Sequence, residues 1–215
     1  MSVHDEVLAA AKDMLRLNLT AGTSGNVSGR TDDGHVVITP SSIPYDTMTL
    51  DDLVVLDMDG KVVEGTRSPS SEKSVHLAAY ARYAEVGSVI HAHPVYASMF
   101  AVAREPIPAV IDEFAVFVGG PVPCAEYAMT GTDQLGENAA DCLADVGSAL
   151  LASHGTVTIA GSPASAIHQL GVVERAAQIV WGARALGNVA ALPEETNATL
   201  GGYYKMLRQM PPAKA

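Results

Sequence analysis

Two histidines separated by one small residue stand at the end of an apolar, β-prone stretch that runs from Ser88 to Pro94. Side chains alternate between the faces of a strand, so His91 and His93 should point the same way, roughly 7 Å apart along the backbone. Pro94 has no amide hydrogen and should end the strand. The spacing predicts two imidazoles at a strand mouth that can bind one metal ion, and the alternative is two exposed histidines.

Two further segments offer ligands for the same ion. Residues 150–155 form an apolar stretch ending at His154, and Gly155 allows close approach of another backbone. Glu72 opens a segment of helical character directly after Ser70 and Ser71. Three imidazoles and a carboxylate suit Zn²⁺ or a similar divalent ion, and a carboxylate that can leave opens a position for substrate. Less favoured as ligands, because they lie in polar or helical contexts, are His4, His35, His76 and His168.

Three turns rich in small and hydroxyl-bearing residues are candidate anion sites. Backbone N–H groups of the Gly22–Ser28 loop can form a nest for an anion. The Thr39–Ser42 turn is a second cluster. Ser70 and Ser71 open a predicted helix, whose free N–H groups and dipole favour phosphate. Ordinary turn or capping chemistry explains each cluster alone, but the three together favour a phosphorylated substrate.

Composition limits the class of protein. The chain has 215 residues, 48% of them hydrophobic, and a net charge of −11, which argues against nucleic acid or an anionic membrane as partner. We find no uncharged apolar run long enough for a transmembrane helix and no pattern of a secretory signal. Cys124 and Cys142 are expected to be reduced packing residues, so we expect a cytoplasmic protein.

Hydrophobic periodicity predicts interleaved helices and strands without a regular βαβ repeat. We therefore expect one domain with a mixed, largely antiparallel sheet covered by helices. Residues 22–28 are predicted to be a loop, 114–118 a strand, and the glycines at 201–202 an interruption of the last helix. The other predicted helices are 2–19, 70–83, 95–103, 132–145 and 163–186, and the other predicted strands are 36–39, 54–57, 61–64, 88–93, 148–153 and 156–160.

These motifs, in this order and spacing, resemble the class II aldolase/adducin family from about Asp5 to Arg208, and within it the fuculose-phosphate aldolase branch. The resemblance implies a single three-layer α/β/α domain over residues 1–215 with a mainly antiparallel central sheet. It also implies a cytoplasmic homotetramer with its active site near a subunit interface. The implied zinc ligands, one ion per subunit, are Glu72, His91, His93 and His154. The implied phosphate pocket comprises Gly25, Asn26, Ser41, Ser42, Ser70 and Ser71.

The resemblance implies retro-aldol cleavage of a small 1-phosphoketose. L-Fuculose 1-phosphate is the leading candidate, giving dihydroxyacetone phosphate and L-lactaldehyde. Cleavage leaves negative charge on a three-carbon fragment, which a divalent cation can stabilise by roughly several kcal/mol. Glu72 would leave the metal and then move a proton on that fragment. A lysine Schiff base is the other solution, but none of the lysines lies in a buried-looking strand.

Several positions depart from the family pattern or leave a choice open. Where the aldolases place a proton-donating tyrosine, this chain has Asp112 followed by Glu113; either is a replacement acid, or both form a salt-bridged surface pair. Ser42 stands where the pattern has glycine. A tyrosine near the C-terminus closes the family's pocket, and Tyr203 is the candidate here, with Tyr204 or simple helix packing as alternatives.

Other activities of the family remain open at this stage. The ribulose-5-phosphate 4-epimerase branch carries aspartate at the position of Glu72, so the longer carboxylate favours an aldolase. Epimerase, dehydratase or decarboxylase action on a related sugar phosphate would use the same metal. A non-catalytic adducin-like module is the third alternative, and the complete ligand set argues against it.

Overall fold

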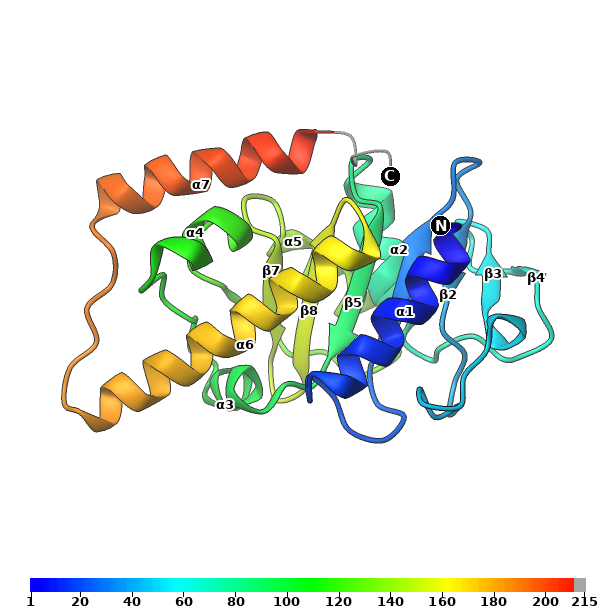
Figure 1. The fold of residues 1–215 in the computed structure, drawn as a ribbon, viewed down its shortest axis with the longest axis horizontal. Coiled ribbons are helices and arrows are strands. Elements are labelled where there is room, and N and C mark those ends of the chain that lie inside the picture. The colour runs from blue at the N-terminus through cyan, green and yellow to red at the C-terminus, as the bar shows by residue number, and fades with distance from the viewer. Residues whose placement is uncertain (211–215) are drawn as a thin grey trace.

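The computed structural model describes residues 1–210 and is built around one eight-stranded sheet (Figure 1). Across the sheet the strands run in the order β4-β3-β2-β1-β5-β8-β7-β6, and only the β6–β7 pairing is parallel. This confirms the expected mixed, mainly antiparallel sheet. The strands are β1 (Asn26–Arg30), β2 (Val36–Ile38), β3 (Val54–Leu56), β4 (Val62–Glu64), β5 (Ser88–Ala92), β6 (Cys124–Ala125), β7 (Ser148–Leu151) and β8 (Gly155–Ala160).

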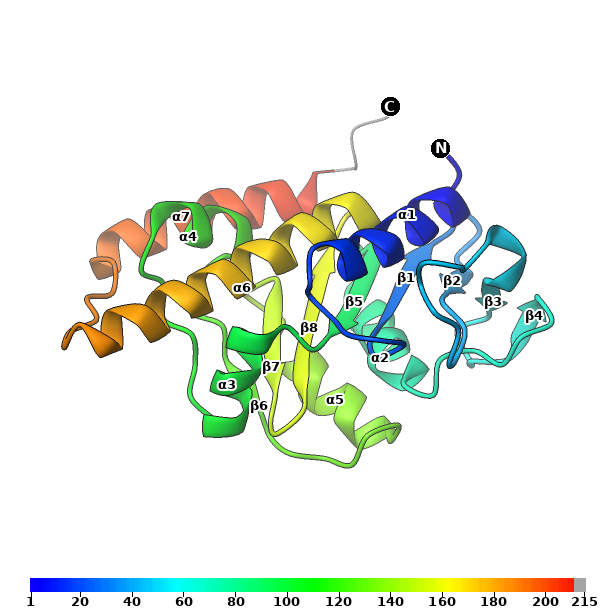
Figure 2. The same cartoon turned by 60° about the horizontal axis from the view of Figure 1, so that its bottom comes forward.

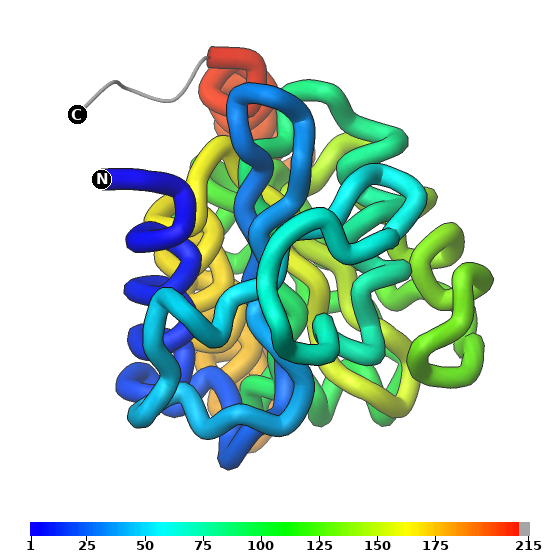
Figure 3. Tube along the Cα trace, turned by 90° about the vertical axis from the view of Figure 1, so that its right-hand side faces the viewer, coloured from blue at the N-terminus to red at the C-terminus, as the bar shows by residue number. Residues whose placement is uncertain are grey.

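Helices cover both faces of the sheet, as Figure 2 and the end-on view of Figure 3 show. Val36 and Ile38 pack in the core beneath α2 and α5, whereas Val37 between them packs beneath α1 and α6. This alternation is the two-residue period of a strand, and it confirms the α/β/α layering. The helices are α1 (Val3–Arg16), α2 (Lys73–Arg82), α3 (Val95–Ala103), α4 (Asp112–Val118), α5 (Asp133–Asp141), α6 (Pro163–Ala185) and α7 (Glu194–Gln209), with a 3₁₀ turn at Leu50–Asp52. Within residues 1–210, every helix is too short or too polar to cross a bilayer.

Strand register gathers one group of polar residues at one end of the sheet. Asn26 on β1 lies opposite His91 on β5, and Val157 on β8 lies opposite His91 from the other side. The turn between β7 and β8 therefore lies at the same end as the His91–His93 motif. Gly25 allows the segment before β1 to lie close to β5, because a Cβ on residue 25 would stand 2.6 Å from the His91 carbonyl oxygen.

Three predicted elements were wrong. Residues 112–118 form helix α4, because Phe114, Ala115 and Val118 are buried at helical spacing in an apolar run too short to separate strand from helix. Residues 26–30 form strand β1. Its polar side chains are buried, whereas such residues in a sequence are typical of a loop, which is why a loop was predicted. Helix α7 continues through Gly201, which lets α7 approach α4 closely: a Cβ there would stand 2.5 Å from the Gly119 carbonyl oxygen.

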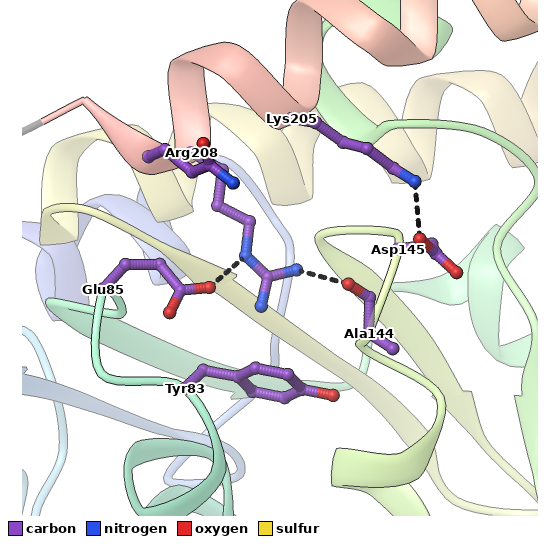
Figure 4. Close-up of a pocket in the computed structure, with 7 residues that line it drawn as sticks. Tyr83, Glu85, Ala144, Asp145, Lys205 and Arg208 are labelled. Atoms are coloured by element: carbon purple, nitrogen blue, oxygen red, sulfur yellow. Dashed lines mark hydrogen bonds and ion pairs between the residues drawn. The ribbon is translucent and has the colours of Figure 1, made fainter.

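Ion pairs and a cation–π contact hold the C-terminal end of α7 beside a cavity of about 250 Å³ (Figure 4). Arg208 Nε lies 2.8 Å from Glu85, its guanidinium lies over the Tyr83 ring, and Lys205 pairs with Asp145. Glu85 precedes β5, so this cavity lies at the end of β5 opposite His91. Its cations are already paired with carboxylates, and it is separate from the histidine motif.

Candidate metal centre

Three imidazoles from two separate strand ends converge. One ring nitrogen of each of His91, His93 and His154 lies within 4.8 Å of the other two. The Nε2 atoms of His91 and His93 are 2.9 Å apart. His154 enters from the β7–β8 turn, where Ser153 adopts a left-handed backbone conformation with φ of +56°. The structure thus brings together the three histidines that the sequence singled out.

Glu72 faces the three rings from the start of α2. Its Oε2 lies 3.2 Å from His91 Nε2, and its Oε1 lies 3.2 Å from His154 Nε2. Thr130 donates to Oε1 at 2.7 Å, and the Asn26 amide donates to Oε2 at 3.3 Å. Glu72 is buried, and each of its carboxylate oxygens has polar partners.

The arrangement of the ring nitrogens fits a bound cation. His91 Nδ1 lies 2.8 Å from the Thr156 carbonyl oxygen and donates to it, so Nε2 is the ring nitrogen that faces the cluster and can bind a cation there. Burial, together with His91 and His154, lowers the pKa of His93 to about 4, so the His93 ring is neutral at pH 7. The Nε2 atoms of His91 and His93 are close enough to share a proton or to bind one cation between them. Three imidazole nitrogens and one carboxylate fit a divalent ion, and Zn²⁺ prefers this donor set.

The charge of Glu72 completes this donor set. Burial acts to raise the pKa of the Glu72 carboxyl, but the imidazoles of His154 and His91 and the Thr130 hydroxyl outweigh that effect. The pKa therefore lies far below its usual range, and the carboxylate is ionised at neutral pH.

The residues of the predicted phosphate pocket lie on segments that meet beside Glu72. Ser41 N–H donates to the Ser68 carbonyl, and Ser41 Oγ donates to the Pro69 carbonyl, so the two serine turns lie side by side. Ser70 Oγ accepts the Glu72 N–H at 3.2 Å. Ser42 and Ser71 are exposed to solvent. Hence two hydroxyls already have partners within the protein, whereas two face outward.

Ser42 shows why the family pattern has glycine at its position. Its φ is +62°, in the left-handed region that residues with a Cβ rarely adopt. The glycine is a conformational requirement of the turn, and this chain meets it with a serine.

Three predicted catalytic residues do not join the cluster within one chain. Glu113 pairs with Arg175 of α6 at 3.0 Å, which is the salt-bridged arrangement considered from sequence, and Asp112 is exposed at the start of α4. Tyr203 is half exposed on α7, and its neighbour Tyr204 is buried by packing. Both helices pack together, and Figure 1 shows α7 beyond the end of the sheet opposite the His91–His93 motif.

Sequence reasoning missed two residues near Glu72, namely Thr130, which donates to it, and His76, which contacts Asn26. Thr130 comes from the loop before α5 and gave no signal in the sequence. His76 lies four residues after Glu72, and that spacing places both on one helix face, which could have identified it. The His76 ring is fully buried, and its burial, together with nearby His91, lowers its pKa to about 3.

Comparison with known proteins identifies the family of this chain. Residues 5–181 match the family described as class II aldolase and adducin N-terminal domain. The chain belongs to this family. An L-fuculose 1-phosphate aldolase of known structure superposes with a TM-score of 0.90 at 36% identity, covering 94% of this chain and 96% of that one.

Curated relatives carry three different activities. The chain is 35% identical over 192 residues to a 5-deoxy-D-ribulose 1-phosphate aldolase of Bacillus thuringiensis, covering 89% of this chain and 90% of that protein. It is 37% identical to an L-fuculose phosphate aldolase of Escherichia coli, covering 81% and 80%. It is also 37% identical to an L-ribulose-5-phosphate 4-epimerase of Salmonella paratyphi B, covering 84% and 85%. The expectation of an aldolase-type enzyme, an aldehyde-lyase, is confirmed at this level.

Proposed function

We propose that this chain is a metal-dependent aldolase that cleaves a small 1-phosphoketose to dihydroxyacetone phosphate and a short aldehyde. The convergence of His91, His93 and His154 on the ionised Glu72 carries this proposal. These four residues would hold one divalent ion, most naturally Zn²⁺. When bound, the ion would supply Lewis-acid stabilisation of the negative charge that develops as the C3–C4 bond breaks.

The chain's own residues supply the proton chemistry. Glu72 is ionised and lies at the cluster, so it is the group that carries a proton to and from C3 of the three-carbon fragment. Thr130 and Asn26 hold one carboxylate oxygen each, which keeps Glu72 directed at the cluster when it is not a metal ligand. The outward-facing Ser42 and Ser71, with Gly25, Asn26, Ser41 and Ser70 beneath them, would receive the phosphate.

Two substrates fit this chemistry. L-Fuculose 1-phosphate, the leading candidate, would give L-lactaldehyde. A relative of similar identity is an aldolase of a phosphoketose with a shorter tail, 5-deoxy-D-ribulose 1-phosphate, which would give acetaldehyde by the same bond cleavage. Both yield the same phosphorylated fragment, so the metal and phosphate sites do not choose between them. The choice lies in the pocket for the aldehyde.

Cleavage also needs a group that takes the proton of the C4 hydroxyl as the aldehyde forms, and that returns it in the reverse reaction. Asp112, Glu113 and Tyr203 lie on helices away from their own chain's cluster. We propose that they act at the site of a neighbouring copy in a cytoplasmic homotetramer, where the site would lie near a subunit interface. If the chain is instead a monomer in solution by light scattering, these three residues have no catalytic role.

The decisive experiment measures dihydroxyacetone phosphate released from a panel of phosphoketoses by zinc-loaded protein. Release from a 1-phosphoketose is expected, and it should be abolished in His93→Gln. The matched control is His168→Gln, since His168 packs edge-on against Phe117 and lies outside the cluster. No release from any member of the panel by metal-loaded protein would refute the aldolase function.

A second candidate function, epimerisation of a sugar phosphate, draws support from the epimerase relative. Product mass separates the candidates, because epimerisation leaves the mass unchanged and aldol cleavage divides the carbon chain. Dehydration removes water and decarboxylation removes CO₂, so the same measurement covers those two activities. A protein that binds no metal and turns over nothing would instead support a non-catalytic module.

A further inference from the structure

A chain of four hydrogen bonds leads from Glu72 into the interior of the protein. Asn26 Nδ2 lies 3.3 Å from Glu72 Oε2, and Asn26 Oδ1 contacts His76 Nε2. His76 Nδ1 lies 2.7 Å from Ser28 Oγ, which lies 2.8 Å from the Tyr80 hydroxyl. The chain thus joins residues of β1 to residues of α2 beneath the candidate metal centre.

The direction of every bond follows from the Asn26 amide, whose nitrogen faces Glu72 and whose oxygen faces His76. Glu72 can only accept, so the amide nitrogen of Asn26 must face it, and the amide oxygen must face His76. His76 Nε2 therefore carries the proton, and the neutral ring accepts at Nδ1 from Ser28. Ser28 has used its one proton, so Tyr80 must donate to Ser28. All four donors point toward Glu72.

Water cannot replace any of these donors. Asn26, Ser28, His76 and Tyr80 are each at most 3% exposed. Hydrogen bonds in such surroundings are strengthened by the low local dielectric, and successive bonds in a chain polarise one another. A donor removed from this chain would leave a buried acceptor without a partner, which is costly.

We propose that His76 is a positioning residue for Glu72: by donating from Nε2 to Asn26 Oδ1, it fixes the Asn26 amide with its nitrogen toward the carboxylate. With the donor at Nε2 missing, the Asn26 amide can turn over and present its oxygen to Glu72, which repels the carboxylate. This inference rests on the proposed function in that Glu72 must serve as metal ligand and proton carrier. It also gives Asn26 a side-chain role separate from the phosphate.

Two variants of similar size separate this role from simple packing. His76→Gln places an amide nitrogen near the position of Nε2, so it can still donate to Asn26. His76→Asn is shorter, so its amide reaches Ser28 but stops short of Asn26. Both variants lose the imidazole ring and should lose a similar amount of thermal stability. Thr158→Val is a further control, because it removes a buried hydroxyl that bonds to Ser148 and has no link to Glu72.

The primary measurement is zinc affinity, by competition with a chromophoric chelator, followed by kcat and KM. His76→Asn is expected to weaken zinc binding about 10-fold, the lower end of the loss seen when the supporting partners of metal ligands are removed. It should lower kcat more than it changes KM, because Glu72 is misdirected in the chemical step. His76→Gln and Thr158→Val should keep the wild-type zinc affinity.

Equal zinc affinity in His76→Gln and His76→Asn would overturn the inference while leaving the metal function intact. A wild-type protein that binds no zinc or other divalent ion would overturn both. An independent test uses the metal-free wild-type protein, where nitrogen-15 spectra of His76 should show the neutral tautomer protonated at Nε2. The Nδ1-protonated tautomer would contradict the direction of the chain even if a variant failed to fold.

Discussion

Replacing Glu72 by glutamine or aspartate tests charge and reach separately. Glutamine keeps the size of the side chain and removes its charge. Its carbonyl oxygen can still accept from Asn26, and its NH₂ group can face the Thr130 hydroxyl oxygen, which can accept. Because no buried donor loses its partner, the free energy of unfolding of the metal-free protein should change by no more than about 1 kcal/mol.

The catalytic effect of Glu72→Gln should be large. An amide cannot carry a proton to or from carbon, so kcat should fall by about 10²- to 10⁴-fold, the usual contribution of a general acid–base group. Zinc affinity should fall as well, because the only negative charge among the four ligands is lost. The rate must therefore be measured at saturating zinc, with the bound metal quantified in each sample.

Glu72→Asp keeps the charge but withdraws the carboxylate by about 1.5 Å, the length of one C–C bond. The contacts at 2.7 Å to Thr130 and 3.2 Å to His91 and His154 would then exceed hydrogen-bonding distance. We expect zinc affinity to fall by about 10-fold or more. The variant should also be assayed with L-ribulose 5-phosphate, since aspartate at this position resembles the epimerase branch.

One result would refute this reasoning directly. If Glu72→Gln, with one zinc bound per chain, released dihydroxyacetone phosphate within about tenfold of the wild-type rate, Glu72 would not be the proton carrier. The metal site would then stand, and another group would have to perform the proton transfer.

Three further predictions concern residues around the site. Ser42→Gly should raise the free energy of unfolding by up to about 1 kcal/mol. Relief of the left-handed conformation contributes about 1–2 kcal/mol, which exceeds the entropic cost of glycine. Ser41→Gly loses a hydrogen bond to Pro69 and should instead lower the free energy of unfolding in the same urea titration. Glu174→Gln should destabilise the protein by about 1–2 kcal/mol and weaken zinc binding. Both Glu174 oxygens accept backbone N–H groups at the start of α3, directly after the His91–His93 motif. An unchanged zinc affinity in the chelator competition assay would contradict the link to the metal. Burial lowers the pKa of His76 to about 3, so in the unfolded chain His76 takes up a proton near pH 6.5 while the folded protein does not. Stability should therefore be complete above about pH 6.5 and fall toward pH 3 by up to about 1.4 kcal/mol per pH unit from this residue. Urea titrations of metal-free protein should show this part of the slope missing in His76→Gln, and identical slopes would refute it.

The sequence by itself identified the four residues that converge at the candidate metal centre, and it predicted the layered fold. His91 and His93 are two residues apart on a strand, and a strand places such residues on one face whatever surrounds it. The apolar runs that end at His93 and His154, with Glu72 at a helix start, limited the arrangement to strand and helix ends. Long periodic helices such as α1 and α6 were also predictable, because their burial pattern is local.

Tertiary structure alone decided which polar residues support those ligands. Asn26 and Ser28 look like loop residues in sequence, yet pairing with β5 makes them part of a central strand and places them beneath Glu72. His76 becomes a donor toward Asn26 only because β1 and α2 pack together. The short apolar run at 114–118 became a helix because α6 and α7 bury it at helical spacing. Contacts between segments distant in sequence settle such features, and apart from the four-residue spacing of Glu72 and His76 no local pattern encodes them.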